Sequence, residues 1–367
     1  MDDDWSGLCG RVRRTVGELV ASGAETGVQV SAYLHGEPVI DVYAGDAHPG
    51  RPATPDTLFP SFSTAKGVTA TVVHVLAERG ALDYDLRIAD VWPEYAAHGK
   101  QDTTLGHALT HATGVPHLPA GTSPADFADW HRMCALIADA VPRWEPGTRQ
   151  GYHAWTYGWI VGETVRRATG RTLARVLAEE VAGPLGVADE LFFGVPERVL
   201  DRVARLGEHG WQPALSYLSA NLPHFDLVCP PAVRPDAALG NRPEILRADV
   251  PAIGTFSARA LARMYAALLG EVDGVRLISP ERLARVSAVA MDGPDWVFGQ
   301  PVRRSLGYAV EDGYFGASGS GGSLSYAFPQ LGLTVAATKN RMSFGDGDPL
   351  EQLRELIQTE VAAAKGS

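Results

Sequence analysis

The sequence predicts an α+β fold, in which an antiparallel sheet is flanked by terminal helices and interrupted by a mostly helical domain. Two observations carry this prediction. Strand-like hairpin patterns occur near both ends of the 367-residue chain, and the middle carries helical patterns broken by Pro and Gly. We expect residues 1–62 and 250–367 to form the sheet domain and residues 63–249 the helical domain. The active site would then lie in the groove between them.

The N-terminal elements are a helix and a hairpin. Apolar residues between 12 and 19 recur at helical spacing with arginines between them. Residues 28–34 and 39–43 have strand composition, and the Gly-Pro-containing segment 35–38 between them is typical of a turn. These patterns predict one helix followed by two antiparallel strands.

A second hairpin and helix lie near the other end. Residues 323–328 and 333–338 read as strands around a turn at 329–332, and a helical pattern covers 349–364. We expect both hairpins to share one sheet. The stretch between them is mostly helical over 64–270, with clear helices at 155–169 and 173–181. The Pro-rich segment 223–251 is expected to be a long irregular loop.

Composition narrows the class of protein. A hydrophobic share of 45% and a charged share of 20% are typical of a soluble globular chain. The net charge of −11 and the lack of a basic run argue against nucleic acid or a membrane surface as partner. The acidic start resembles neither a signal peptide nor a membrane span. Three widely spaced cysteines predict no disulfide framework, so we expect a cytoplasmic protein. The oligomeric state stays open.

Ser63 and Lys66 are the strongest candidates for chemistry. Strand and turn character over 57–62 precedes them and an apolar helical pattern over 67–79 follows, which places Ser63 at a helix N-terminus. Side chains three residues apart on a helix share one face, so the lysine amine can reach the serine oxygen and activate it. The alternative is a serine N-cap followed by a solvated lysine. The apolar surroundings argue against an unpaired ammonium there.

Four segments together resemble the serine β-lactamase and penicillin-recognising superfamily, specifically its class C β-lactamase-like and family VIII carboxylesterase branch. They are Phe59-Pro60-Ser61-Phe62-Ser63-Thr64-Ala65-Lys66, Ala108-Leu109-Thr110-His111-Ala112-Thr113-Gly114-Val115-Pro116, Pro146-Gly147-Thr148-Arg149-Gln150-Gly151-Tyr152 and Phe315-Gly316-Ala317-Ser318-Gly319-Ser320-Gly321-Gly322. Their order and spacing agree with the Ser-x-x-Lys box, the His-containing turn, the tyrosine box and the third box. The resemblance covers roughly residues 25–345 and implies a β-lactamase-like fold.

The resemblance also implies catalytic roles. Ser63 would be acylated by an ester, amide or lactam carbonyl. Tyr152 would exchange its proton with Ser63 and the leaving group while Lys66 supports it; the alternative makes Lys66 the neutral base. The backbone N–H groups of Ser63 and Ser320 would hold the oxyanion. The strand edge at Ala317, Ser318 and Gly319 would lie close to substrate. Neither a metal nor an organic cofactor is implied.

Two departures from the family pattern concern the substrate. Ala154 stands where β-lactamases carry an asparagine that binds the acylamide side chain, which favours an ester over a lactam. Ala317 stands where the family has Lys, His or Trp, which favours a substrate without an essential carboxylate. We therefore expect a carboxylesterase acting on a small-molecule ester. The alternatives are an acyltransferase with an alcohol or amine acceptor, an idle ligand-binding protein and, lowest in rank, a β-lactamase.

Other candidate residues have weaker signals. Residues 316–320 fail the Gly-x-Ser-x-Gly elbow because Ser320 occupies the last position. His107, His111 and His117 suggest a metal, but no nearby carboxylate or Cys spacing completes a site, and we expect a structural, hydrogen-bonded role for His111. Among the aromatic residues, Trp155 and those of the predicted loop 211–225 are the candidates for lining an acyl pocket.

Overall fold

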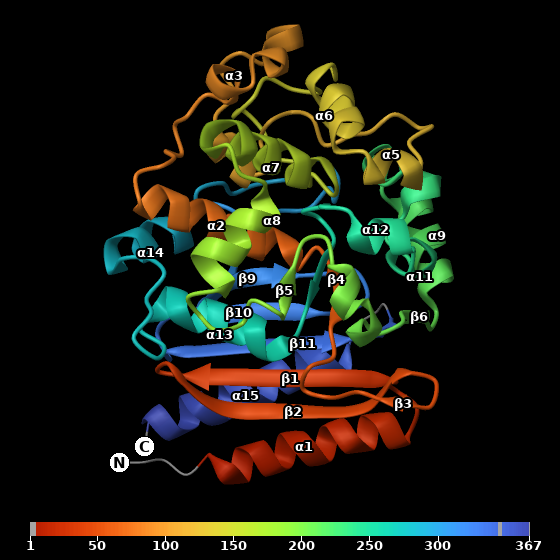
Figure 1. The fold of residues 1–367 in the computed structure, drawn as a ribbon, viewed down its shortest axis with the longest axis vertical. Helices are drawn as coiled ribbons and strands as arrows, with labels where there is room; N and C mark the ends of the chain where they lie inside the picture. Colours follow the sequence, from red (N-terminus) through yellow and green to blue (C-terminus); the bar gives the residue numbers. More distant parts are fainter. Residues whose placement is uncertain (1–4, 344–346, 367) are drawn as a thin grey trace.

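The structure is a computed structural model and describes residues 5–343 and 347–366. Its main sheet has seven strands in the order β3-β2-β1-β11-β10-β9-β8 (Figure 1). These strands are β1 (Gly27–Leu34), β2 (Glu37–His48), β3 (Arg51–Pro52), β8 (Ala309–Glu311), β9 (Tyr314–Ser318), β10 (Leu324–Phe328) and β11 (Leu333–Lys339). All neighbouring strands run antiparallel.

The two hairpins predicted at the ends of the chain meet in the centre of this sheet. Strand β1 pairs with β11 in continuous register, from Val28 opposite Lys339 to Leu34 opposite Leu333. The prediction of one shared antiparallel sheet is confirmed. The sequence interpretation missed β8, and the first residues of the third box belong to β9.

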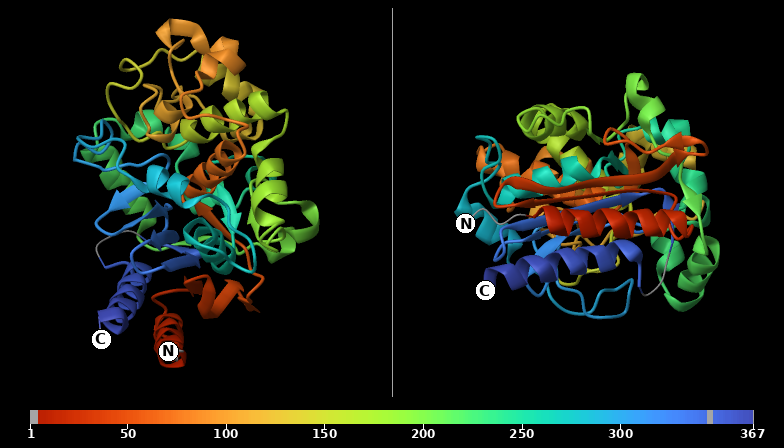
Figure 2. Two further views of the ribbon diagram at one scale, coloured as in Figure 1. Left: turned by 90° about the vertical axis from the view of Figure 1, so that its left-hand side faces the viewer. Right: turned by 90° about the horizontal axis from the view of Figure 1, so that it is seen from below.

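The terminal helices cover one face of the main sheet. Helix α1 (Ser6–Ala21) and helix α15 (Pro349–Gly366) lie side by side there, as the view from below shows (Figure 2). A separate hydrophobic core fills the space between these helices and the sheet. It includes Val12 and Val16 of α1, Val30 of β1, and Leu353 and Ile357 of α15. Burial of one apolar stripe per helix therefore explains why both amphipathic patterns dock on this face.

The opposite face of the sheet carries the larger core and the rest of the helices. Helix α13 (Ala258–Leu269) packs directly on β1, β10 and β11. The longer helices further out are α2 (Ala65–Glu78), α6 (Trp130–Ala138), α7 (Thr156–Thr169), α9 (Trp211–Asn221) and α14 (Pro280–Ser287). The shorter ones are α3 (Ile88–Val91), α4 (Leu105–Leu109), α5 (Pro124–Ala128), α8 (Leu173–Val176), α10 (Phe225–Val228), α11 (Ala237–Gly240) and α12 (Pro243–Arg247), with 3₁₀ segments at Pro93–Gly99, Glu197–Arg202 and Pro231–Val233.

A small second sheet joins parts of the chain that are far apart in sequence. Strand β7 (Gly254–Phe256) pairs antiparallel with both β4 (Phe59–Phe62) and β5 (Leu191–Phe192). A further parallel pair joins β6 (Gly207–Glu208) to β12 (Arg341–Met342). The expected boundary after residue 62 falls at the end of β4, and the one at residue 250 falls just before β7. The division into two domains remains a prediction.

The helix expected over 173–181 is present, as α8 followed directly by a π-helical turn at Leu177–Ala182. Two other local predictions for the helical region were wrong. The segment expected to be an irregular loop over 223–251 contains α10, α11 and α12. The stretch 211–225 is largely helix α9 rather than loop. Short helices with Pro near their starts carry little periodicity, so the sequence pattern cannot reveal them.

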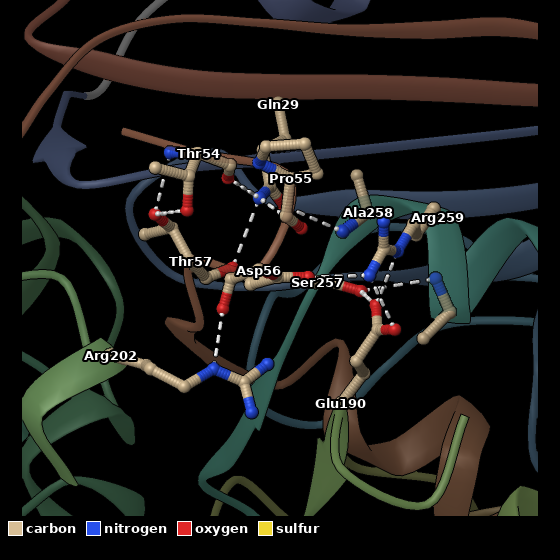
Figure 3. Close-up of polar contacts among 11 residues, drawn as sticks. Gln29, Thr54, Pro55, Asp56, Thr57, Glu190, Arg202, Ser257, Ala258 and Arg259 are labelled. Atoms are coloured by element: carbon tan, nitrogen blue, oxygen red, sulfur yellow. Dashed lines mark hydrogen bonds and ion pairs between the residues drawn. The ribbon is translucent and has the colours of Figure 1, made fainter. Parts of the chain in front are cut away.

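A buried glutamine joins the main sheet to the segment that leads into β4. Gln29 on β1 is 4% exposed, and its Nε2 donates to the carbonyls of Thr54, Pro55 and Thr57 at 2.8, 3.2 and 3.0 Å (Figure 3). Its Oε1 accepts from the backbone N–H of Ala258 at 3.0 Å. One side chain therefore anchors both the segment that leads into β4 and the start of α13.

A carboxylate beside it completes this junction. Glu190 accepts from the Ser257 hydroxyl at 2.5 Å and from the Arg259 guanidinium at 2.8 Å (Figure 3). The same guanidinium reaches Asp56 at 2.7 Å. The contacts link the approach to β5, the end of β7 and the segment before β4, and so support the strands that precede Ser63.

We expect Gln29→Met to lower the free energy of unfolding by about 3 kcal/mol, because it removes the glutamine partner of the buried Thr57 carbonyl and of the buried Ala258 N–H. Urea denaturation measures this loss. The matched control is Gln101→Met at an exposed position, which should change stability by less than about 0.5 kcal/mol. Equal stability of the two variants would contradict the anchoring role.

Candidate active site

Ser63 lies in a tight turn between β4 and α2. The strand ends at Phe62, a non-glycine residue with a φ of 43°, and the helix begins at Ala65. This left-handed conformation is costly for a bulky side chain and persists only where the surroundings enforce it. Phe62 is 1% exposed, so core packing holds the turn. The turn places Ser63 at the N-terminal end of the helix, as predicted, where the residue is half-buried.

The structure brings Lys66 and Tyr152 to Ser63. Lys66 Nζ donates to Ser63 Oγ at 2.9 Å, and the Tyr152 hydroxyl is hydrogen-bonded to the same oxygen at 2.7 Å. Nζ also donates to the carbonyl of Ala154 at 2.7 Å and lies 4.9 Å from the centroid of the Tyr152 ring. Two groups that can hold or release a proton therefore converge on one serine oxygen.

Lys66 is buried and its hydrogen-bond partners are neutral groups. The residue is 4% exposed. Its amine donates to two acceptors, the Ser63 hydroxyl and the Ala154 carbonyl. An amine in such a place interacts strongly with the atoms it touches, because little water screens it. The side chain at position 154 plays no part in this contact, since the backbone carbonyl is the acceptor. The backbone of Ala154 thus binds the lysine amine, while its methyl side chain provides no amide group to the cavity.

His111 packs against the other side of the tyrosine. Its ring centroid lies 5.2 Å from that of Tyr152 and 4.9 Å from that of Tyr157. Its Nδ1 accepts from the backbone N–H of His153 at 3.0 Å. Burial keeps the pKa of His111 well below its usual range, and the charge of Arg304 acts in the same direction. The ring is therefore neutral, with a hydrogen-bonded place in the structure, as the sequence interpretation expected for it.

The other two histidines of this region take separate positions. His107 Nδ1 accepts from the backbone N–H of Thr104 and completes the capping box of α4. His117 is half-buried, and burial lowers its pKa to about 4. Across residues 5–343 and 347–366, no group of three or more His, Cys, Asp or Glu side chains is arranged to hold a metal ion.

The end of β9 forms one wall of the site. Strand β8 pairs with β9 only as far as Gly316, so the edge is open from Ala317 onward. Ala317, Ser318, Gly319 and Ser320 all line the cavity that contains Ser63. The residue at Gly319 must be glycine, because an added Cβ would lie 2.0 Å from the carbonyl oxygen of Ser61. This lets the strand end approach the serine turn closely.

Two backbone amides at this junction are free. Among the residues that the structure describes, neither the N–H of Ser63 nor that of Ser320 donates to another group. A free N–H at the start of a helix and another at an open strand end both favour a negatively charged ligand atom. The pair is suited to an oxyanion next to Ser63 Oγ.

The cavity above Ser63 has a volume of about 640 Å³ and a largely apolar wall. Trp155, predicted as a wall residue, is 2% exposed and packs edge-on against Phe127 at 5.1 Å between ring centroids. Helix α9 adds three side chains at helical spacing. These are Trp211, Leu215 and Leu218.

Sequence reasoning missed the remaining wall of the cavity. Val297, Phe298 and Arg304 come from the irregular segment between α14 and β8. Asp348 directly precedes α15, and Glu351 lies in its first turn. An irregular segment carries no periodic signal, and the acidic pair reads as an ordinary helix start. Only the three-dimensional arrangement shows that these residues line the same cavity as Ser63.

Two further findings concern the chain as a whole. None of the helices within the described ranges is both long and apolar enough to cross a membrane.

Cys9, Cys134 and Cys229 are all free thiols. Burial raises the pKa of the Cys229 thiol, which lines the cavity, to about 12, so it is not a competing nucleophile at neutral pH.

The fold and the site together define a hydrolase of the serine β-lactamase-like type. The chain belongs to the β-lactamase family, whose family model ("Beta-lactamase") matches residues 12–359. It is 34% identical over 338 residues to the esterase/β-lactamase LipL of Mycobacterium tuberculosis, covering 86% of this chain and 77% of that protein. It is 30% identical over 337 residues to penicillin-binding protein 4 of Amycolatopsis lactamdurans, covering 87% and 80%.

Solved structures give the same family placement. A family VIII carboxylesterase superposes with a TM-score of 0.85 at 33% identity, covering 95% of this chain and 97% of that one. A penicillin-binding protein homologue from Caulobacter crescentus superposes with a TM-score of 0.82 at 33% identity and 97% coverage of both chains. The predicted β-lactamase-like α+β fold and the family resemblance are confirmed.

Proposed function

We propose that this protein is a carboxylesterase that hydrolyses small-molecule esters through an acyl-enzyme on Ser63. The observation that carries the proposal is the convergence of Lys66 Nζ and the Tyr152 hydroxyl on Ser63 Oγ, at 2.9 and 2.7 Å. Relatives named as an esterase/β-lactamase and a family VIII carboxylesterase support an ester as substrate.

The proposed chemistry proceeds in two steps. Ser63 Oγ attacks the ester carbonyl carbon, and its proton passes through Tyr152, or directly to Lys66, and on to the departing alkoxide. The bond between the carbonyl carbon and the alcohol oxygen breaks, which leaves an acyl-serine and a free alcohol. Water then attacks the acyl group by the reverse proton path and releases a carboxylic acid. The N–H groups of Ser63 and Ser320 would hold the oxyanion in both steps.

Charge in the cavity supports a substrate without a carboxylate. Ala317 offers no cation at the open end of β9, and the guanidinium of Arg304 is already bound to Asp295 and Gln150. The other charged residues in the lining besides Lys66 are the acids Asp348 and Glu351, found at the start of α15. An anionic substrate would therefore lose solvation without gaining a free cationic partner.

The position of Ala154 supports an ester over a lactam. Ala154 is 6% exposed and lines the cavity, but its methyl group cannot form hydrogen bonds to the acylamide of a β-lactam. The apolar wall formed by Trp155 and helix α9 suits a hydrophobic acyl or alcohol group instead.

Acyl transfer from the same acyl-enzyme is the second candidate. The cavity volume of about 640 Å³ exceeds that of a short acyl group and leaves space for an alcohol or amine acceptor beside Ser63. Its apolar lining would favour an organic acceptor over water. Whether an added alcohol diverts the product from acid to ester separates the two candidates.

A panel of three substrates tests the proposed specificity. We expect a neutral p-nitrophenyl ester to be hydrolysed with a kcat/KM at least about 100-fold higher than its analogue carrying a carboxylate in the acyl chain. A chromogenic cephalosporin should be turned over more slowly than either ester. A preference for the anionic ester, or efficient cephalosporin turnover, would contradict the substrate assignment.

A further inference from the structure

A buried ion pair beside the cavity has no role in the proposed chemistry. Arg304 is 5% exposed and Asp295 is 1% exposed, with Nη2 and Oδ2 2.7 Å apart. Burying two charges costs free energy that their attraction recovers only with good geometry and further hydrogen bonds. The remaining contacts of this pair therefore indicate what it does.

The first arm of the pair leads to the backbone that carries Tyr152. Arg304 Nη1 donates to Oε1 of Gln150, which is 2% exposed and lies two residues before the tyrosine. The Nε2 of Gln150 donates to the carbonyls of Gly293 and Val302 at 2.8 and 2.7 Å. Three partners from the 293–304 segment thus hold this side chain.

The second arm leads to the face of the tyrosine ring. Asp295 Oδ1 accepts from the backbone N–H groups of Val297 and Phe298 at 2.7 and 3.0 Å. The Phe298 ring centroid lies 5.2 Å from that of Tyr152. The same turn is tied back to the tyrosine segment, since the N–H of Trp296 donates to the carbonyl of Gln150 at 3.0 Å.

We propose that Gln150, Asp295 and Arg304 form a positioning cluster that aims the Tyr152 hydroxyl at Ser63. This inference rests on the proposed function, in which that hydroxyl carries the proton. Gln150 holds the backbone just before Tyr152, and Asp295 holds the turn that packs Phe298 against the Tyr152 ring. The cluster touches no reacting atom, so its effect passes through the position of one phenol. Displacement of a catalytic group by about 1 Å lowers rates by about 100-fold.

The direct test is Gln150→Met, which cuts the link to the tyrosine segment and leaves the ion pair intact. We expect the acylation rate per active site to fall about 30-fold while KM changes less than about threefold. Counting active sites by Ser63 labelling removes any contribution of misfolded protein. Gln150→Glu retains an acceptor for Arg304 and should recover part of the rate.

Arg304→Met tests whether the cluster acts as a unit. The acylation rate of the double variant Gln150→Met/Arg304→Met should be within about threefold of that of the slower single variant. Both changes remove the same hydrogen bond, so their effects should not add. The matched control is Arg303→Met, which removes the neighbouring, more exposed arginine that pairs with Asp312, and should keep the wild-type rate. If the two losses multiply, or if Gln150→Met equals this control, the cluster has no positioning role.

A structural readout separates this inference from the proposed function. In crystals of Gln150→Met, the Tyr152 hydroxyl should lie beyond 3.5 Å from Ser63 Oγ, compared with 2.7 Å in the native chain. An unmoved tyrosine would overturn the positioning cluster even if the enzyme is an esterase. Absence of any acylation in the wild type and in Arg303→Met would instead overturn the proposed function.

Discussion

Lys66→Ala should lower the acylation rate of Ser63 by about 10⁴-fold or more, the largest effect expected of a single change that leaves the serine in place. The amine contacts Ser63 Oγ at 2.9 Å and lies over the ring of Tyr152. Lys66 is either the base itself or the group that supports Tyr152 as the base. In both cases its removal deprives Ser63 and Tyr152 of the amine that both contact. Stopped-flow acylation by an activated ester measures the loss.

The control for this variant is another buried lysine. Lys100 is fully buried, and its Nζ donates to three backbone carbonyls far along the chain from Ser63. Lys100→Ala should lower the melting temperature but leave the acylation rate per active site unchanged. If Lys66→Ala kept a rate near that of Lys100→Ala, the proposed mechanism would be wrong.

Tyr152→Phe should lower the acylation rate by about 10³-fold with little change in KM, because the ring stays packed while the proton carrier is lost. The ring contacts with His111 and Phe298 need no hydroxyl. A loss of this size in kcat alone assigns the hydroxyl to the transition state rather than to substrate binding.

Tyr95→Phe provides the matched control, since Tyr95 is a fully buried tyrosine beside Trp92, in the 3₁₀ segment Pro93–Gly99. The acylation rate of Tyr95→Phe should equal that of the native enzyme. A Tyr152→Phe variant that retains more than about a tenth of the rate would make Lys66 the base that acts without the phenol.

The sequence was informative where residue spacing alone sets geometry. Ser63 and Lys66 are one helical turn apart, so helix formation is sufficient to bring them together. The turns at 35–38 and 329–332 likewise pair the strands on either side of them. These two hairpins were sufficient to predict one antiparallel sheet. Tyr152 was identifiable only through family resemblance, because its approach to Ser63 depends on long-range packing.

What the sequence could not reveal lies in segments without periodicity. The 288–305 stretch has no repeating apolar pattern, yet it supplies Phe298 to the cavity and Arg304 to the network around Gln150. Whether a charged residue in such a segment faces solvent or a buried partner is decided by tertiary contacts. The short strands β5 and β7 were hidden for the same reason.

The most direct test of the central claim is intact-protein mass spectrometry after mixing with a short-chain activated ester, comparing the native chain with Ser63→Ala. We predict an added acyl mass that requires Ser63 and disappears in water, and faster loss with ester formation when an alcohol acceptor is present would identify acyl transfer. An adduct that forms equally on Ser63→Ala, or no adduct on either protein, would contradict an acyl-enzyme at Ser63.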